Sequence, residues 1–224
     1  DALGFACEIR EMPAVTHNRA ATEFRYEAMC RVYEGILPVR KLGQTHIWFT
    51  PWDYLIRWWG IQEAMIDLVE RPELVHAGVE RMVDAWMIEL DQFVEQNLLS
   101  LDCDNTRIGS GGYGYTEQLP GGRHAPGGKG DSPRPTFGRC PPERPEGCCA
   151  QMGTVPFSDA VPFSAGGYNP DYVRPHNMWG CSNAQIFSEV SPAMHWEFAL
   201  KHDLRWLARW GLTYYGCCEP LARK

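Results

Sequence analysis

The feature that most constrains this chain is a segment rich in proline and glycine, residues 121–165. These 45 residues hold 8 of the 17 prolines and 8 of the 22 glycines. Proline lacks the backbone N–H donor and glycine loses more conformational entropy than other residues when it is ordered, so the segment cannot form ordinary helix or central strand. The sequence therefore predicts two foldable blocks, residues 1–120 and 166–224, separated by an irregular or disordered insert.

Composition and charge restrict the classes of partner. Of the 224 residues, 44% are hydrophobic and 22% are charged, which excludes a wholly disordered chain. The formal net charge of −7 disfavours binding to nucleic acid. No apolar run approaches the roughly 18 residues that a membrane-spanning helix needs. We expect a small-molecule substrate and neither nucleic acid nor a membrane as partner.

The cysteine count bears on the compartment. The chain has nine cysteines, an odd number, and no charged and apolar leader at its start. This pattern favours a reducing cytoplasm over a secreted disulfide framework. The first residue is Asp1 rather than methionine, so we expect the chain to be a fragment or a processed product.

Hydrophobic periodicity predicts strands that alternate with helices. The apolar runs 46–49, 98–103 and 212–215 are typical of buried strands. Between the first two, the spacing of apolar residues predicts a helix after Trp59 and a second, longer helix from Pro72 to Asn97. This alternation is typical of parallel βα units.

A further helix is predicted in the second block. Ser191 and Pro192 supply an N-cap and a first-turn proline, and Gly211 ends the helix. One face is expected to carry apolar side chains, namely Trp196, Leu200, Leu204 and Leu207. His195 and His202 lie seven residues apart and are expected to be surface or hydrogen-bonded polar residues.

Several stretches resemble a known family. Residues 59–75, with the sequence Trp-Gly-Ile-Gln-Glu-Ala-Met-Ile-Asp-Leu-Val-Glu-Arg-Pro-Glu-Leu-Val, resemble the helix-proline-helix of the uroporphyrinogen decarboxylase superfamily. Residues 188–198 are similar to that family's Ser-Pro helix start, and residues 104–112 resemble a loop in an uncharacterised branch. The resemblance covers 46–119 and 167–221. It implies an α/β fold of the (β/α)8 TIM-barrel type that acts as a decarboxylase or as a methyltransferase.

The length of the chain limits that barrel. A complete barrel takes about 250 residues, whereas fewer than 200 residues here lie outside the insert. We therefore expect an incomplete barrel, begun by residues 1–120, continued by 166–224 and truncated at its C-terminal end.

A metal site is predicted after the third strand. In the corrinoid-linked methyltransferases of the family, this strand leads to a His-x-Cys zinc motif, and Tyr215 stands here in the place of the histidine. Tyr215, Cys217 and Glu219 share one face of an extended strand, and zinc accepts both cysteine sulfur and carboxylate oxygen. Cys217 and Glu219 are the predicted metal ligands, with zinc and a corrinoid (cobalamin) as implied cofactors. The alternative is that Cys217 is a buried small apolar residue.

The other candidate residues follow the other strands. Asp102 and Asp104 are candidate acid–base residues at a strand end, and turn formation is the alternative for both. The remaining substrate-binding candidates are expected at the same end of the barrel or in the aromatic wall of a pocket. They are Asn105, Gly111, Gly112, Trp48, Trp52 and Tyr215. A flexible loop is the alternative for the two glycines, and core packing is the alternative for the two tryptophans.

Three functions remain open at this level. The resemblance favours methyl transfer between a corrinoid protein and a small molecule, supported by a metal-bound thiolate. Decarboxylation of uroporphyrinogen in porphyrin biosynthesis, with Asp102 or Asp104 stabilising a protonated substrate, is the second. Residues 46–59 offer it one arginine, Arg57, whereas a substrate with many carboxylates needs several. The third is a truncated, non-catalytic domain that binds a ligand or assembles as a homo-oligomer.

Overall fold

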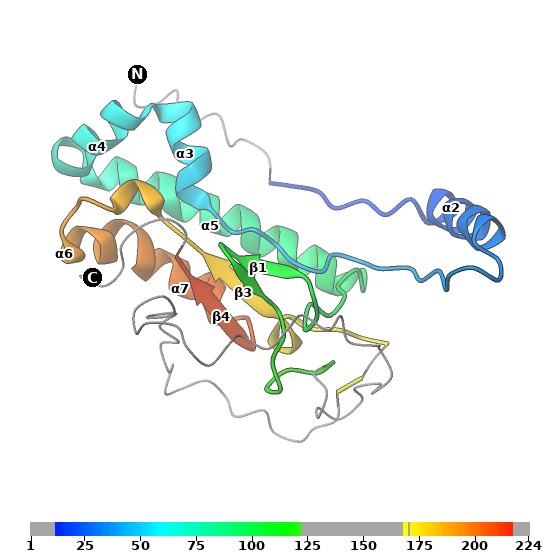
Figure 1. Cartoon of the computed structure of the whole chain (residues 1–224). Coiled ribbons are helices and arrows are strands. Elements are labelled where there is room, and N and C mark those ends of the chain that lie inside the picture. Colours follow the sequence, from blue (N-terminus) through cyan, green and yellow to red (C-terminus); the bar gives the residue numbers. More distant parts are fainter. Residues whose placement is uncertain (1–11, 122–167, 170, 217–224) are drawn as a thin grey trace, which may run out of the picture.

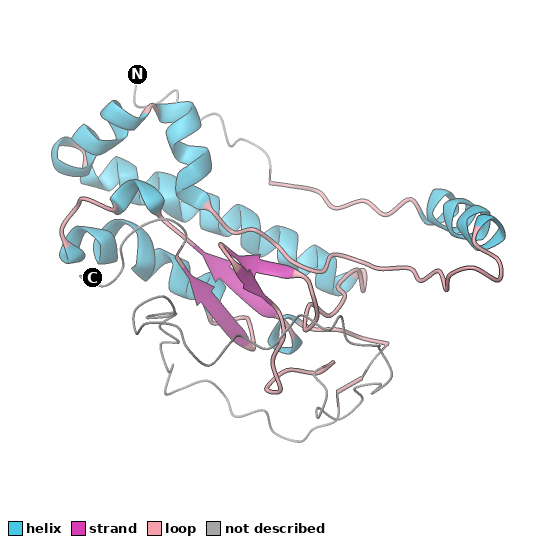
Figure 2. Cartoon of the chain, in the orientation of Figure 1, coloured by secondary structure: helices cyan, strands magenta, loops and turns pink. Residues whose placement is uncertain are grey.

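The structure is a computed structural model that describes residues 12–121, 168–169 and 171–216. Its elements in chain order are α2 (Arg19–Val32), α3 (Pro51–Trp59), α4 (Ile61–Glu70), α5 (Pro72–Glu95), β1 (Arg107–Gly109), β2 (Gly112–Tyr113), the 3-10 turn η1 (Pro175–Asn177), β3 (Trp179–Ser182), the 3-10 turn η2 (Gln185–Phe187), α6 (Pro192–His195), the π-helical turn η3 (Trp196–Leu200), α7 (Lys201–Leu207) and β4 (Leu212–Tyr215). Helices pack along one side of the small sheets (Figures 1 and 2). Of the predicted insert 121–165, all but Gly121 lies outside the described residues.

The three helices α3, α4 and α5 follow one another with minimal connections. Gly60 separates α3 from α4 with φ of 91°, a conformation that favours glycine. Pro72 begins α5 in the first helical turn, where its missing N–H has no intrahelical partner to lose. α5 ends at Glu95, and Asn97 takes φ of 54° directly afterwards. The predicted pair of helices on either side of Pro72 is therefore confirmed as α4 and α5, whereas α3, from Pro51 to Trp59, was not predicted.

The second block forms one strand–helix–strand unit. β3 and β4 pair in parallel, with Trp179 opposite Leu212 and Ser182 opposite Tyr215. The helical segment α6–η3–α7 connects them and begins at Ser191, whose side chain accepts a hydrogen bond from the Met194 N–H. The predicted strand 212–215 and its preceding helix are confirmed, and the βα unit is the one from which parallel sheets and barrels are built.

The predicted apolar face of that helix is shifted. Trp196 is 51% exposed, and of the predicted face only Leu207 is buried; the other buried positions are His195, Phe198, Ala199, His202, Asp203 and Trp206. The π-helical turn η3 inserts wider i→i+5 spacing at this point, so the buried face does not follow the 3.6-residue period that predicted Trp196. His195 and His202 are buried rather than at the surface, and each has a side-chain hydrogen-bond partner, Tyr215 and His76 respectively, so the alternative that they are hydrogen-bonded polar residues is confirmed.

The two earlier predicted strands, 46–49 and 98–103, do not form as strands, so this prediction is wrong. Gln44 and Leu99 form an isolated parallel bridge, and residues 46–49 and 100–103 have no ladder of their own among the described residues. β1 and β2 form a short antiparallel hairpin with Gly111, at φ of 81°, in its turn. The described part of the chain contains two two-stranded sheets and no closed barrel, and the (β/α)8 architecture stays a prediction.

A single hydrophobic core joins the two blocks. Phe49, from the first block, stacks on Trp206 of α7 with ring centroids 4.7 Å apart. Trp52 on α3 packs edge-on against Phe187, and its indole Nε1 donates to the Phe198 carbonyl at 2.9 Å. Since aromatic side chains bury more area than any others, these contacts make the two blocks one folding unit despite the insert between them.

The N-terminal arm, residues 16–42, differs from the rest of the molecule. It carries α2, none of whose residues is buried, and it extends away from the helices and sheets (Figure 1). In the described part of the chain, no helix is both long enough and apolar enough to cross a membrane.

Candidate functional site

Asp102 is the most deeply buried of the predicted site residues. It lies near the end of segment 99–103, and its side chain is fully inaccessible. Both carboxylate oxygens lie 3.1 Å from the backbone N–H of Trp179, the first residue of β3. Asp102 thus joins the end of one extended segment to the start of the next strand.

His46 faces the same carboxylate from the first extended segment. Its Nδ1 lies 3.5 Å from Asp102 Oδ2, and its side chain is 4% exposed. That separation is long for a hydrogen bond, and neither ring nitrogen has a hydrogen-bond partner among the described residues. A buried imidazole without a hydrogen bond is costly, and a catalytic role is one of the explanations for such a group in a native structure.

The surroundings of Asp102 favour its protonated form. Burial raises the pKa of the carboxyl above its ordinary value, while the neighbouring His46 ring and the Trp179 N–H oppose that shift. A carboxyl that keeps its proton more readily, beside an imidazole, can pass a proton to or from a reacting atom.

A second buried carboxyl lies at the end of β3. The Ser182 hydroxyl donates to Asp203 Oδ2 at 2.7 Å, and both side chains are almost fully buried. Burial raises the pKa of Asp203 to about 7, although the Ser182 hydrogen bond opposes this. Asn183 follows Ser182, and its Oδ1 is buried without a hydrogen-bond partner among the described residues, as is Asp203 Oδ1. The carboxyl end of β3 therefore gathers polar groups in an apolar environment.

The end of β4 completes this polar region. Tyr215 pairs in register with Ser182, and its hydroxyl contacts Nε2 of His195, which is 4% exposed. The π-helical turn begins directly after His195, and such turns occur frequently at functional sites. Because β3 and β4 are parallel, their carboxyl ends meet at one edge, the edge at which α/β proteins bind ligands.

Asp104 and Asn105 have a different setting from Asp102. Asp104 is exposed, and its Oδ1 accepts from both the N–H and the hydroxyl of Thr106, at 2.7 and 2.6 Å. This is the turn geometry that aspartate commonly forms. Asn105 is exposed beside it. The structure thus does not bring Asp104 to the Asp102–His46 pair.

The two candidate glycines and two candidate tryptophans are spread over the molecule. Gly111 is exposed in the β1–β2 turn, and Gly112 is buried in β2. Trp48 is 46% exposed and meets His46 edge-on with ring centroids 5.0 Å apart. Trp52 lies in the hydrophobic core, so only Trp48 of these four is placed beside the Asp102–His46 pair.

The predicted metal ligands Cys217 and Glu219 lie outside the described residues. Within residues 12–121, 168–169 and 171–216, no three histidine, cysteine or acidic side chains are placed to hold a metal ion. Cys181 is buried, and burial raises its thiol pKa to about 12, so that thiol stays protonated at neutral pH.

Sequence reasoning missed His46, which lies beside Asp102 near the start of β3, and Ser182 and Asp203 at the carboxyl end of β3. His46 begins an otherwise apolar run, and a polar residue in such a run is a signal that could have identified it as a candidate site residue. Asp203 gave no reliable sequence signal, because the π-helical turn η3 precedes it and shifts the buried face of the helix. Ser182 gave no sequence signal, because β3 itself was not predicted.

Comparisons of this chain with protein-family models, with curated proteins and with solved structures found no match. The function must therefore be argued from the residues described above.

Proposed function

We propose that the chain acts as a general acid–base enzyme on a small-molecule substrate, of the decarboxylating kind that its resemblance to the uroporphyrinogen decarboxylase superfamily implies. The observation that supports this most is the fully buried Asp102 carboxyl, 3.5 Å from an imidazole whose nitrogens are otherwise unbonded among the described residues. Structural carboxylates in interiors are usually paired with a cation or with several donors.

The chemistry needs a proton at one defined place. When a carboxylate leaves as carbon dioxide, the carbon that carried it must receive a proton, and a positioned side chain supplies it. Asp102 holds its proton more readily than an ordinary aspartate, because burial raises its pKa. In this proposal Asp102 is the proton donor, and His46, which lies beside it, orients the carboxyl and restores its proton.

The experiment is a decarboxylation assay with a matched control. We expect the full chain to release carbon dioxide from uroporphyrinogen without added corrinoid or metal. Asp102→Asn should lower the rate by about 100-fold or more, the usual contribution of a general acid. Asp104→Asn removes a carboxylate two residues away that is exposed in a turn, and should stay within a few-fold of the parent. No release by the parent chain, or equal rates for the two variants, would contradict the proposal.

A second candidate is methyl transfer from a corrinoid, supported by a metal-bound thiolate at Cys217 with Glu219. One observation favours it: β4 ends at Tyr215, two residues before Cys217, at the edge where the β3 and β4 carboxyl ends meet. Zinc analysis of the full chain separates this candidate from the first. It requires stoichiometric zinc that is lost in Cys217→Ser, whereas the acid–base proposal requires that the activity survive removal of zinc by a chelator.

A further inference from the structure

Among the described residues, the N-terminal arm is hydrogen-bonded to the body of the molecule at its base. On one side, the Gln92 side chain donates to the Pro13 carbonyl and accepts from the Val15 N–H, both at 2.8 Å. On the other side, the Gln44 N–H donates to the Leu98 carbonyl at 2.7 Å, and the Gly43 N–H donates to Ser100 Oγ at 2.8 Å. Both attachments are polar and lie next to each other at the end of α5, so the arm leaves the body at a fixed place.

One face of α2 packs against the returning part of the arm itself. Lys41 lies 2.6 Å from a carboxylate oxygen of Glu23 and 4.7 Å from the centre of the Tyr26 ring. The residues that share this face, Thr22, Tyr26, Cys30 and Tyr33, are half-buried. These contacts define which side of α2 is covered within the chain.

The opposite face of α2 is apolar and uncovered. Ala20, Phe24, Ala28 and Val32 recur at four-residue spacing, and Phe24 and Val32 are 72% and 64% exposed. The chain after the helix adds Ile36 and Leu37, which are 70% and 61% exposed. A helix of 14 residues with no buried side chain is marginal in water by itself, so this face gains stability from a partner.

The arm and the helical end of the body carry opposite charge. Residues 16–42 hold five basic side chains and three acidic ones, whereas α3 and α4, residues 51–70, hold four acidic and one basic. On α2, Arg25 lies on one border of the apolar stripe, and towards the other border Arg31 lies 3.7 Å from a carboxylate oxygen of Glu27. The whole arm is thus basic in a chain whose net charge is −7.

The outer face of α4 has the matching character. Ile66 and Val69 are 53% and 75% exposed and lie one turn apart, with Ile61 at 59% on the same side. Glu63 and Glu70 are exposed at the border of this patch. The α4 face is therefore apolar with an acidic border, whereas the α2 stripe is apolar and belongs to an arm of net positive charge.

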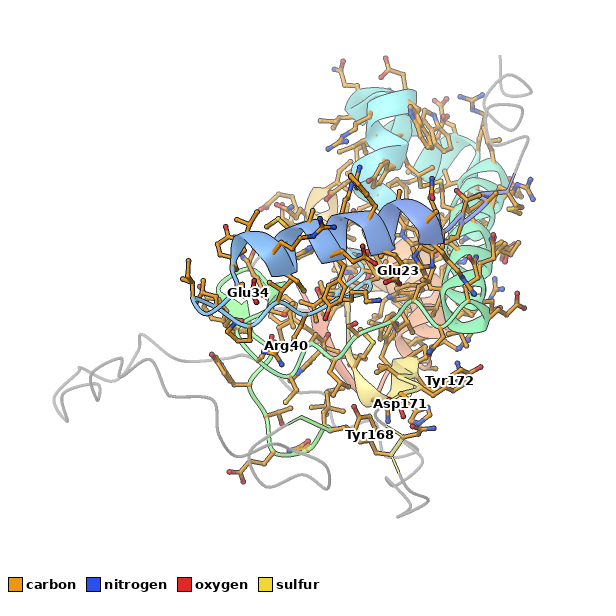
Figure 3. All side chains as sticks on the ribbon, turned by 90° about the vertical axis from the view of Figure 1, so that its right-hand side faces the viewer. Glu23, Glu34, Arg40, Tyr168, Asp171 and Tyr172 are labelled. Carbon is orange, nitrogen blue, oxygen red and sulfur yellow. The ribbon has the colours of Figure 1, made fainter. Side chains whose placement is uncertain are left out.

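We propose that the arm of one molecule docks through its α2 stripe on the α4 face of a second copy of this chain, and that the two copies exchange arms reciprocally. α2 and α4 lie at opposite ends of the molecule in Figure 1, so the arm does not cover α4 of its own chain. Figure 3, which views the molecule from the arm side, shows α2 with Glu23, Glu34 and Arg40 on the arm, in front of the body. Reciprocal exchange closes a two-fold dimer and buries both exposed apolar faces at once.

The same exchange explains the charge distribution. A helix that presents anchors at four-residue spacing to an apolar face is a common mode of recognition between proteins. Arginines on one side and glutamates on the other steer the encounter and disfavour the stripe-to-stripe pairing of two basic arms. We therefore expect the dimer to weaken as salt concentration rises, because exposed charge pairs are screened.

The test is sedimentation velocity on the full chain over a concentration series. We expect a dimer for the parent and monomers for Phe24→Glu in the stripe and for Val69→Glu in the α4 face. The matched control is Tyr113→Glu, which alters an aromatic residue of similar exposure, 59%, on the β1–β2 hairpin and should remain dimeric. Circular dichroism spectra equal to the parent's verify that each variant is folded.

Mixing the two monomeric variants distinguishes the proposed contact from others. A mixture of Phe24→Glu and Val69→Glu retains one intact pair of arm and α4 face, so it should form a heterodimer weaker than the parent dimer. A monomeric parent chain at all concentrations would overturn the proposal. A dimer that Val69→Glu leaves intact would also overturn it, since α2 would then pair with a surface other than α4. A mixture that stays monomeric would overturn the reciprocal exchange.

Discussion

The body of the molecule and its N-terminal arm use the same kinds of residue in opposite ways. In the body, Phe49, Trp52 and Trp206 are at most 1% exposed and pack on one another or on neighbouring rings. In the arm, Phe24 is 72% exposed and α2 has no buried residue. The body therefore buries its large apolar side chains in its own core, whereas the arm leaves its apolar side chains exposed.

The largest expected difference in the free energy of unfolding is between two variants that each replace an aromatic side chain by alanine. Trp206→Ala removes a fully buried ring that stacks on Phe49 and an indole N–H that donates to the Cys181 carbonyl at 3.2 Å. We expect a loss of about 3–5 kcal/mol in the free energy of unfolding. Phe24→Ala should change it by less than about 0.5 kcal/mol. Urea unfolding at concentrations where the chain is monomeric measures both, and losses of equal size would contradict the contrast.

The pH dependence of stability is expected to come from the body. The folded-state pKa of Asp203 is about 7, above the unfolded value of about 3.9. The folded state therefore binds this proton more tightly, and stability falls as pH rises from about 4 to about 7 and levels off above that. The change attributable to Asp203 is on the order of 2–4 kcal/mol.

Asp203→Asn tests that assignment. Asparagine keeps an oxygen for the Ser182 hydroxyl but does not titrate, so urea unfolding of the variant should show a shallower fall between about pH 4 and pH 7. Asp102, whose pKa is also raised by burial, supplies the slope that remains. A variant with the same slope as the parent would show that Asp203 ionises normally.

Asp67 in the body is expected to have a smaller effect on stability, and its pH dependence should have the opposite sign to that of Asp203. Its carboxylate accepts from Arg71 Nε and Nη2 at 2.7 and 2.6 Å and from Trp59 Nε1 at 2.8 Å. The hydrogen bonds from Arg71 are the main reason that its pKa is lowered, so its contribution is present above about pH 4 and lost as pH falls through the lowered pKa. Asp67→Asn should lower the melting temperature at neutral pH by less than Trp206→Ala does. The difference in melting temperature between Asp67→Asn and the parent should become smaller as the pH is lowered.

The smallest effect is expected in the arm. Lys41 and Glu23 form an ion pair whose side chains are 45% and 56% exposed. Lys41→Met should leave global unfolding unchanged, because exposed ion pairs contribute little. Hydrogen exchange of α2 amides should nevertheless accelerate, since the pair tethers the returning chain to the helix. Unchanged exchange in α2 would show that this contact does not hold the arm together.

The periodic elements could be predicted from the sequence, and the contacts between distant segments could not. Pro72, the apolar spacing that follows it and the stop at Asn97 predict α5 because each acts within a few residues. Strand 212–215 is similarly marked by its apolar run and the glycines on either side. β3 escapes prediction because Trp179–Ser182 is four residues long and has no alternation of polar and apolar side chains.

The candidate site depends on tertiary contacts that no local pattern encodes. Asp102 was recognised from its place at a predicted strand end, but its partner His46 lies 56 positions earlier and meets it only through the packing of two extended segments. The π-helical turn rotates the buried face of the helix and brings His195 to Tyr215, which a 3.6-residue period does not predict. Asp104 looked equivalent to Asp102 in sequence, and only burial separates the two.

The central claim is that Asp102 is a proton-holding carboxyl in the body of the molecule. Carbon-13 NMR of the aspartate side-chain carboxyls, with the Asp102 signal assigned by its loss in Asp102→Asn, reports the titration midpoint of that carboxyl directly. The account predicts a midpoint above the ordinary aspartate value of about 3.9, and a further rise in His46→Ala, because the histidine favours the charged form. A midpoint at or below the ordinary value would contradict it.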